Sequence, residues 1–245
     1  MTNEIEEHLP ATFLNGLKAG LPIGLGYLIV SFTFGMTACL SGFTPLEAIF
    51  MSMTNVTSAG QFAGMQLINS QATYIELIIT VGIINIRYLL MSAVLSQKLS
   101  DKMTLLQRLA MSFGVTDEIF SVALVEVKEV TFNYFIGLFT LPYLGWVFGT
   151  VFGALMDNLL DPQMQSAASI ALYCMFIALV LPPAKHHKDI RYVVLLTIVL
   201  RILFIFTPIL NTISSGYSII LCATLAAILG AIRYRPTLTE SEVSH

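Results

Sequence analysis

The sequence predicts an all-α polytopic integral membrane protein with about six to eight transmembrane helices, one or two of them broken or re-entrant. Apolar residues make up 56% of the 245-residue chain and charged residues only 11%, and the mean hydropathy is +0.80. A soluble domain carries roughly 25% charged residues, so most of this surface must face lipid. Apolar runs long enough to cross the hydrocarbon core recur along the chain. These observations exclude a soluble globular protein.

Seven apolar runs have the length of a membrane span. They are residues 21–40, 46–68, 74–95, 132–156, 166–181, 192–210 and 218–232. An eighth segment, residues 105–127, holds three acidic residues and would be a poor lipid-facing span. Because short polar connectors separate the runs, we expect one transmembrane domain at residues 16–234 between cytoplasmic tails at 1–15 and 235–245.

The lysines and arginines of the short loops predict the orientation, because cytoplasmic loops carry an excess of these residues. Basic residues cluster at 98–108, at 185–191 and after Ile232, whereas several other connectors carry none. With the basic clusters in the cytoplasm, two segments lie between connectors that should be on opposite sides of the membrane. An odd number of crossings is needed there, so not every segment can be a full span. We therefore predict that residues 46–68 and 105–127 are incomplete, as in transporters that line cavities with broken helices. The alternative is seven or eight full spans.

The densest polar content inside an apolar run lies between Met51 and Gly64. Four side chains there recur at the spacing i, i+3, i+4 and i+7, which is one face of a helix: Thr54, Thr57, Ser58 and Gln61. Facing lipid, these groups would be costly to bury, whereas facing a cavity they would offer hydroxyls and an amide to a polar ligand. The alternative is that they make hydrogen bonds between helices.

Two polar residues, Asn85 and Arg87, lie deep in the run at 74–95. An arginine inside a span is costly and marks a functional residue by default, and its fork of donors suits a carboxylate. The acidic residues Asp117 and Glu118 lie in a mostly apolar segment. Either Arg87 forms a structural ion pair with a carboxylate, or it receives a substrate carboxylate while Asp117 or Glu118 gains and loses a proton.

The composition excludes several other functions. The histidines and cysteines lack the short spacing of metal ligands, so we expect no metal site and no cofactor. No phosphate-binding loop, nucleophile elbow or zinc-protease motif occurs, so we expect no enzyme. The net charge of −3 does not suit nucleic acid. A second buried base, Arg201, is expected to pair with Asp157 or Asp161.

Several short motifs occur in a fixed order along the chain. They are Gly20-Leu-Pro-Ile-Gly24, Phe34-Gly35, Ser41-Gly-Phe-Thr-Pro-Leu-Glu-Ala48, Ser58-Ala-Gly-Gln-Phe-Ala63, Asn85-Ile-Arg-Tyr-Leu-Leu90 and Thr116-Asp-Glu118. In this order and spacing, the chain from Leu14 to Tyr234 resembles the AzlC family, the large subunit of two-component branched-chain amino acid exporters. The resemblance implies export of leucine, isoleucine, valine and sometimes methionine across a bacterial inner membrane. It also implies a small hydrophobic partner subunit of the AzlD type.

From the residues and the resemblance together we expect a multi-pass secondary transporter. Gln61, the other polar residues of its helix face and Asn85 would line the substrate site, and Arg87 would bind the substrate carboxylate. Asp117 or Glu118 would couple transport to protons. Two other functions remain open. One is a channel or facilitator for another small solute, and the other is a non-transporting assembly subunit. Glycine pairs at small-xxx-small spacing suit helix packing within the chain or against such a subunit.

Overall fold

The computed structural model describes residues 10–156, 170, 177, 180–181, 184–207, 210 and 213–234. Within these residues the secondary structure is helical, apart from an isolated bridge between Leu99 and Val130, which confirms the predicted all-α class. The chain divides into two compact units. The first is Met1–Asn69 with Val81–Tyr173, and the second is Ser70–Thr80 with Cys174–His245. Several predicted features lie outside the described residues: most of the run at 166–181, Asp157 and Asp161, most of the N-terminal tail at 1–15 and all of the C-terminal tail at 235–245.

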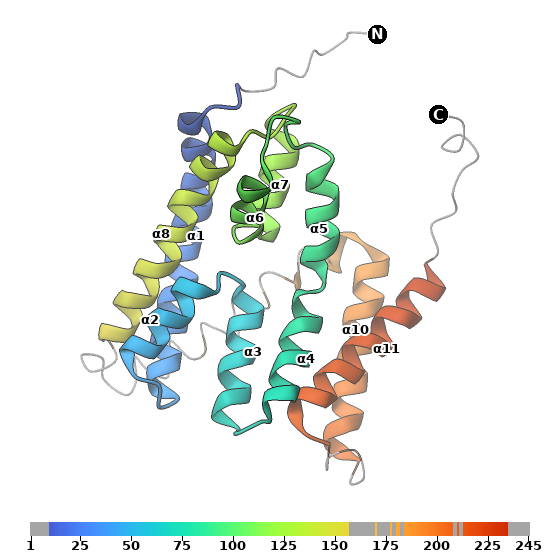
Figure 1. Ribbon diagram of the computed structural model, residues 1–245. Helices are drawn as coiled ribbons and strands as arrows, with labels where there is room; N and C mark the ends of the chain where they lie inside the picture. The colour runs from blue at the N-terminus through green and yellow to red at the C-terminus, as the bar shows by residue number, and fades with distance from the viewer. Residues whose placement is uncertain are drawn as a thin grey trace. The chain divides into compact units, whose positions relative to one another are not determined.

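The first unit is built on α1 (Phe13–Leu40) and α8 (Phe132–Met156), which lie side by side along their length (Figure 1). Helix α1 begins eight residues before the predicted run, because the Thr12 hydroxyl caps it by accepting the backbone N–H of Asn15 at 3.3 Å. Glycines let the two backbones approach closely. A Cβ added to any of five of them would overlap the backbone of the other helix: Gly16, Gly20, Gly24, Gly149 and Gly153. These five glycines therefore serve helix packing within the chain, which is one of the two roles expected for the glycine pairs.

The segment at 46–68 is broken, as predicted. Its first part is α2 (Pro45–Thr54), which starts with a capping box between Thr44 and Glu47. The backbone N–H and the hydroxyl of Thr44 donate to the Glu47 carboxylate and hold its pKa below the usual range. The backbone is extended at Asn55, and α3 (Ser58–Asn69) follows.

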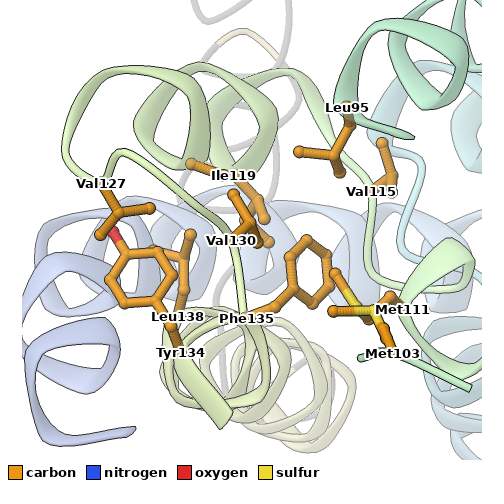
Figure 2. Close-up of a cluster of buried hydrophobic side chains, with 11 residues drawn as sticks. Leu95, Met103, Met111, Val115, Ile119, Val127, Val130, Tyr134, Phe135 and Leu138 are labelled. Carbon is orange, nitrogen blue, oxygen red and sulfur yellow. The ribbon is translucent and has the colours of Figure 1, made fainter. Parts of the chain in front are cut away.

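The segment at 105–127 is also broken, as predicted. It forms α6 (Leu105–Ser112) and α7 (Asp117–Val125), capped by Thr104 and Thr116. Buried apolar side chains from α7, the following loop and the start of α8 pack together here (Figure 2). Their central members are Ile119, Val127, Val130, Tyr134, Phe135 and Leu138.

The predicted span at 74–95 is bent in the structure. The structure places α4 (Tyr74–Asn85) and α5 (Arg87–Ser96) at an angle of 43°. At the bend, the N–H of Ile86 donates to Ile83 O, and the N–H of Leu89 donates to Ile86 O. These three-residue steps replace the four-residue steps of an α-helix and account for the bend.

In the second unit, α10 (Lys188–Phe206) packs against α11 (Ser215–Arg233). Three described helices, Phe13–Leu40, Phe132–Met156 and Gly216–Arg233, are long and apolar enough to cross a membrane, and the bent pair of α4 and α5 would make a fourth.

Large apolar side chains stay exposed on the outer faces of the helices. Leu106 is 78% exposed on α6, Val125 is 74% exposed on α7, and Phe206 is 80% exposed on α10. Apolar exposure on this scale is typical of a surface that meets lipid or another apolar partner. It agrees with the predicted membrane location.

Candidate functional site

A cavity of about 130 Å³ lies where the break between α2 and α3 meets the break between α6 and α7. Its walls come from both breaks and from the start of α5. The lining residues are Thr54, Asn55, Val56, Thr57, Tyr88, Ser112, Phe113, Val115 and Thr116. Non-helical backbone is tolerated at membrane depth where it lines such a cavity. Two of the residues predicted to bind substrate, Thr54 and Thr57, are in this lining.

The four polar residues predicted to share one helix face do not do so. Thr54 ends α2, where its hydroxyl donates to Phe50 O at 2.8 Å, and Thr57 precedes α3. Ser58, which is half-buried, and Gln61 belong to α3. The prediction of a continuous face is wrong because the chain leaves the helical conformation at Asn55.

Gln61 lies inside the protein with 1% of its surface exposed. Its amide nitrogen donates to Ser52 Oγ at 2.6 Å, and its amide oxygen accepts from the indole nitrogen of Trp146 at 3.1 Å. Ser52 Oγ lies 2.7 Å from Thr150 Oγ1. These bonds join α3 to α2 and α8, as in the alternative of hydrogen bonding between helices. The sequence did not single out the three partners, although Trp146 is the only tryptophan of the chain.

Asn85 joins the end of α4 to the cavity wall. Thr57 Oγ1 donates to Asn85 Oδ1 at 2.7 Å. Gly60 fits against this bond, since an added Cβ would lie 2.8 Å from Thr57 Oγ1 and 2.9 Å from Asn85 Nδ2. The structure therefore brings together two residues that the sequence predicted for the site from separate apolar runs.

Arg87 and Asp117 form an ion pair, with Nη1 and Oδ2 2.8 Å apart. Their side chains are 44% and 45% exposed, and the guanidinium also lies 5.2 Å from the centre of the Tyr88 ring. Each partner is the chain neighbour of a cavity residue, Tyr88 in one case and Thr116 in the other. The pair therefore stands beside the cavity, and the structure shows the ion-pair alternative that the sequence left open.

Glu118 contacts a residue that the sequence did not single out. The hydroxyl of Tyr27 lies 2.6 Å from Glu118 Oε2 and 2.7 Å from Thr116 Oγ1. The Tyr27 ring meets Trp146 edge to face, with 5.4 Å between ring centres. Tyr27 thus connects the acidic start of α7 to the buried contacts of Gln61. The signal in the sequence was a tyrosine inside an apolar span, whose hydroxyl needs a partner.

In the part of the chain that the structure describes, no group of three or more histidine, cysteine, aspartate or glutamate side chains is placed to hold a metal ion.

The comparisons with known proteins agree with this architecture. A family model described as AzlC protein matches residues 22–160, a stretch that contains every lining residue of the cavity. The chain is 29% identical over 187 residues to "Inner membrane protein YgaZ" of Escherichia coli strain K12, covering 74% of this chain and 76% of that protein.

Two further relatives are described as uncharacterized membrane proteins. The chain is 33% identical over 177 residues to one from Archaeoglobus fulgidus, covering 71% of this chain and 77% of the relative. It is 27% identical over 204 residues to one from Helicobacter pylori strain J99, covering 78% and 87% respectively. No solved structure matches the chain.

Proposed function

The chain belongs to the AzlC family, and from that premise we propose that it is a secondary transporter that exports branched-chain amino acids across a bacterial inner membrane. Its relatives are membrane proteins, which is consistent with a transport role. The observation that carries the proposal is the cavity at the two helix breaks with an arginine–aspartate pair beside it.

A free amino acid carries a carboxylate and an ammonium group, and the Arg87–Asp117 pair offers the complement of both. The guanidinium of Arg87 suits the carboxylate, and the Asp117 carboxylate suits the ammonium. Both side chains are almost half exposed, and such pairs contribute only about 0–1 kcal/mol to stability. A substrate that separates Arg87 from Asp117 therefore replaces one weak ion pair with two, one from its carboxylate to Arg87 and one from its ammonium group to Asp117.

The lining of the cavity supports a small aliphatic substrate. Val56, Phe113 and Val115 supply apolar surface, and threonine hydroxyls lie around them. A volume of about 130 Å³ is well below the roughly 300–1,000 Å³ typical of sites for drug-sized ligands. Leucine, isoleucine, valine and methionine combine the required apolar side chain with small size.

Two further parts of the proposal rest on the family resemblance: a small hydrophobic partner subunit of the AzlD type and a location in the inner membrane. Coupling to protons is another part, for which the sequence pointed to Asp117 or Glu118 because they lie in a mostly apolar segment. The description of the Escherichia coli relative as an inner membrane protein supports the location. The exposed apolar faces of the helices are compatible with both lipid and a small membrane partner.

The test is efflux of labelled leucine from preloaded cells that carry this chain, a candidate small partner, both or neither. We expect faster efflux with both chains, and its loss in Arg87→Gln. Arg108→Gln is the matched control, because it removes the same charge from α6 at a residue outside the cavity lining. Unchanged efflux of all four amino acids in every combination would contradict the proposed substrate. Leucine efflux without accelerated exchange in proteoliposomes would identify a channel instead.

A further inference from the structure

A buried carboxylate lies in the second unit. Glu76 is 5% exposed, near the start of α4. The hydroxyl of Ser214 donates to Glu76 Oε1, and the backbone N–H of Gly216 donates to the same oxygen at 3.0 Å. The ion pair found among the described residues joins Arg87 to Asp117 and does not involve Glu76.

Part of this arrangement has a structural explanation. Ser214 and Gly216 stand at the start of α11, and the N-cap residue Ser214 makes no side-chain capping bond of its own. A carboxylate at a helix N-terminus accepts a free backbone N–H and is favoured by the helix dipole. Glu76 therefore caps α11 from another helix. Capping alone does not require a second polar group beside the carboxylate.

Such a second group is present one helical turn further along α4. Thr80 is fully buried, and its Oγ1 has no hydrogen-bond partner in the structure. A Cβ added to Gly216 would lie 2.5 Å from Glu76 Oε1 and 2.9 Å from Thr80 Oγ1. The carboxylate oxygen and the unpartnered hydroxyl thus converge on the point where Gly216 lacks a side chain. Buried hydroxyls are almost always bonded, so an exception needs an explanation.

We propose that Glu76 and Thr80 form the site that carries the coupling proton of this transporter. Thr80 Oγ1 has no bond to the carboxyl in the structure; after protonation, a movement of the carboxyl toward Thr80 would let its O–H donate to Thr80 Oγ1, while Oε1 keeps the bonds from Ser214 and Gly216. When it is ionised, the start of α11 stabilises the charge. The site would then offer the carboxyl a partner in each protonation state. The inference rests on the proposed transport function and assigns the proton to Glu76 in place of Asp117 or Glu118.

In the described part of this unit, no basic side chain on the neighbouring helices forms an ion pair with Glu76. On α4, Tyr74 is 85% exposed, and on α11, Tyr217 is 40% exposed. On α10, Arg201 donates to Ser218, which stands one turn after Ser214 on α11. An ionised Glu76 thus has hydrogen bonds but no bonded cation. Protonation removes a charge that is costly inside a membrane domain.

The position along α4 fits a role in export. With the basic loop after α5 in the cytoplasm, the start of α4 lies at the extracytoplasmic end of the bent pair. A proton from outside reaches Glu76 first, so inward proton movement would drive outward movement of substrate.

The first experiment compares two transport modes of the purified chain with its partner in proteoliposomes. Leucine counterflow needs no net proton movement, whereas leucine movement driven by an imposed pH gradient does. In Glu76→Gln, which resembles the protonated carboxyl, we expect counterflow to persist and stimulation by the gradient to disappear. Glu47→Gln is the matched control and should keep both modes, because Glu47 is exposed and glutamine also suits a capping box.

A second readout does not depend on transport. Infrared difference spectra between acidic and neutral pH should show a protonated carboxyl C=O band that is absent from Glu76→Gln and shifted in Thr80→Val. If the wild type moves no leucine yet shows this band, the proposed function fails and the proton site stands. If Glu76→Gln keeps the band and full stimulation by the pH gradient, the proton site is overturned and the transport function stands. A stimulation that requires sodium instead of a pH gradient, and is lost in Glu76→Gln, would also overturn the proton as occupant.

Discussion

The indole nitrogen of Trp146 donates to the side-chain amide oxygen of Gln61, 3.1 Å away, and both side chains are buried. The bond joins α8 to α3, next to the break where the cavity opens. The amide that the sequence predicted for substrate binding is therefore bonded to protein on both its oxygen and its nitrogen. It holds the broken helix against the pair of α1 and α8.

Gln61→Met should lower stability more than a substitution on the exposed face of the same helix. It leaves the indole N–H of Trp146 without its acceptor, and a buried unsatisfied group costs about 1–3 kcal/mol. We expect a lower Tm in detergent than for the wild type. Gln66→Met on the exposed face of α3 is the control and should change Tm little. Equal Tm values for the two variants would show that the buried bonds do not stabilise the fold.

The Arg87–Asp117 pair should matter more for transport than for stability. Asp117→Asn should change unfolding by no more than about 1 kcal/mol, because both partners are partly exposed. It should raise the KM for leucine, since the ammonium group loses its partner. The reversed pair Arg87→Asp with Asp117→Arg would restore the ion pair but not the binding of the zwitterion. If this double variant transports leucine at the wild-type rate, the ion pair has only a structural role. The control for Asp117→Asn is Asp101→Asn, in an exposed loop.

Two glycines of α1 should respond in opposite ways to alanine. A Cβ at Gly35 would overlap the backbone oxygen of Thr150 on α8, whereas a Cβ at Gly26 would meet open space. Overpacking costs about 1–3 kcal/mol, and glycine in a helix interior is about 1 kcal/mol less favourable than alanine. Gly35→Ala should therefore lower Tm in detergent, and Gly26→Ala should keep or raise it. A similar loss in both variants would contradict the close packing of α1 and α8.

Val115 should influence which amino acid is accepted. Its side chain is 6% exposed and lines the cavity, and in the sequence it lies between Phe113 and Asp117. Val115→Phe fills the cavity and should reduce leucine transport more than alanine transport. A pocket discriminates by about 10–200-fold per methylene, so the ratio of kcat/KM values measures the effect. Val125→Phe, at a residue 74% exposed on α7, is the control, and equal ratios in the two variants would place the substrate elsewhere.

The hydropathy and the charges of the sequence predicted much of the architecture. The apolar run at 132–156 coincides with α8 at both ends. The parity of the basic loops indicated that residues 46–68 and 105–127 are incomplete, and both are broken. Each of these properties is a sum over neighbouring residues, so it is already present in the linear chain.

The candidate site could be predicted only in part. Arginine and aspartate inside apolar runs stood out as candidate site residues, yet the sequence left open whether they pair with each other. The bend at Ile86 was missed because no proline marks a break in the run at 74–95, and the polar residues Asn85 and Arg87 on either side of it were interpreted as site residues. The polar spacing from Thr54 to Gln61 suggested a helix face, because helical periodicity does not reveal the extended residue at Asn55.

By itself the sequence determined that the chain is a helical membrane protein, where one long helix, α8, starts and ends, and that the segments at 46–68 and 105–127 are incomplete. Only the tertiary structure decided that Arg87 meets Asp117, that Gln61 is bonded to Trp146 across 85 residues, and that Glu76 meets Gly216 across 140. Transfer into lipid is an additive property of each segment. The partners of a buried polar group depend instead on how distant helices pack, and a local pattern holds no record of that packing.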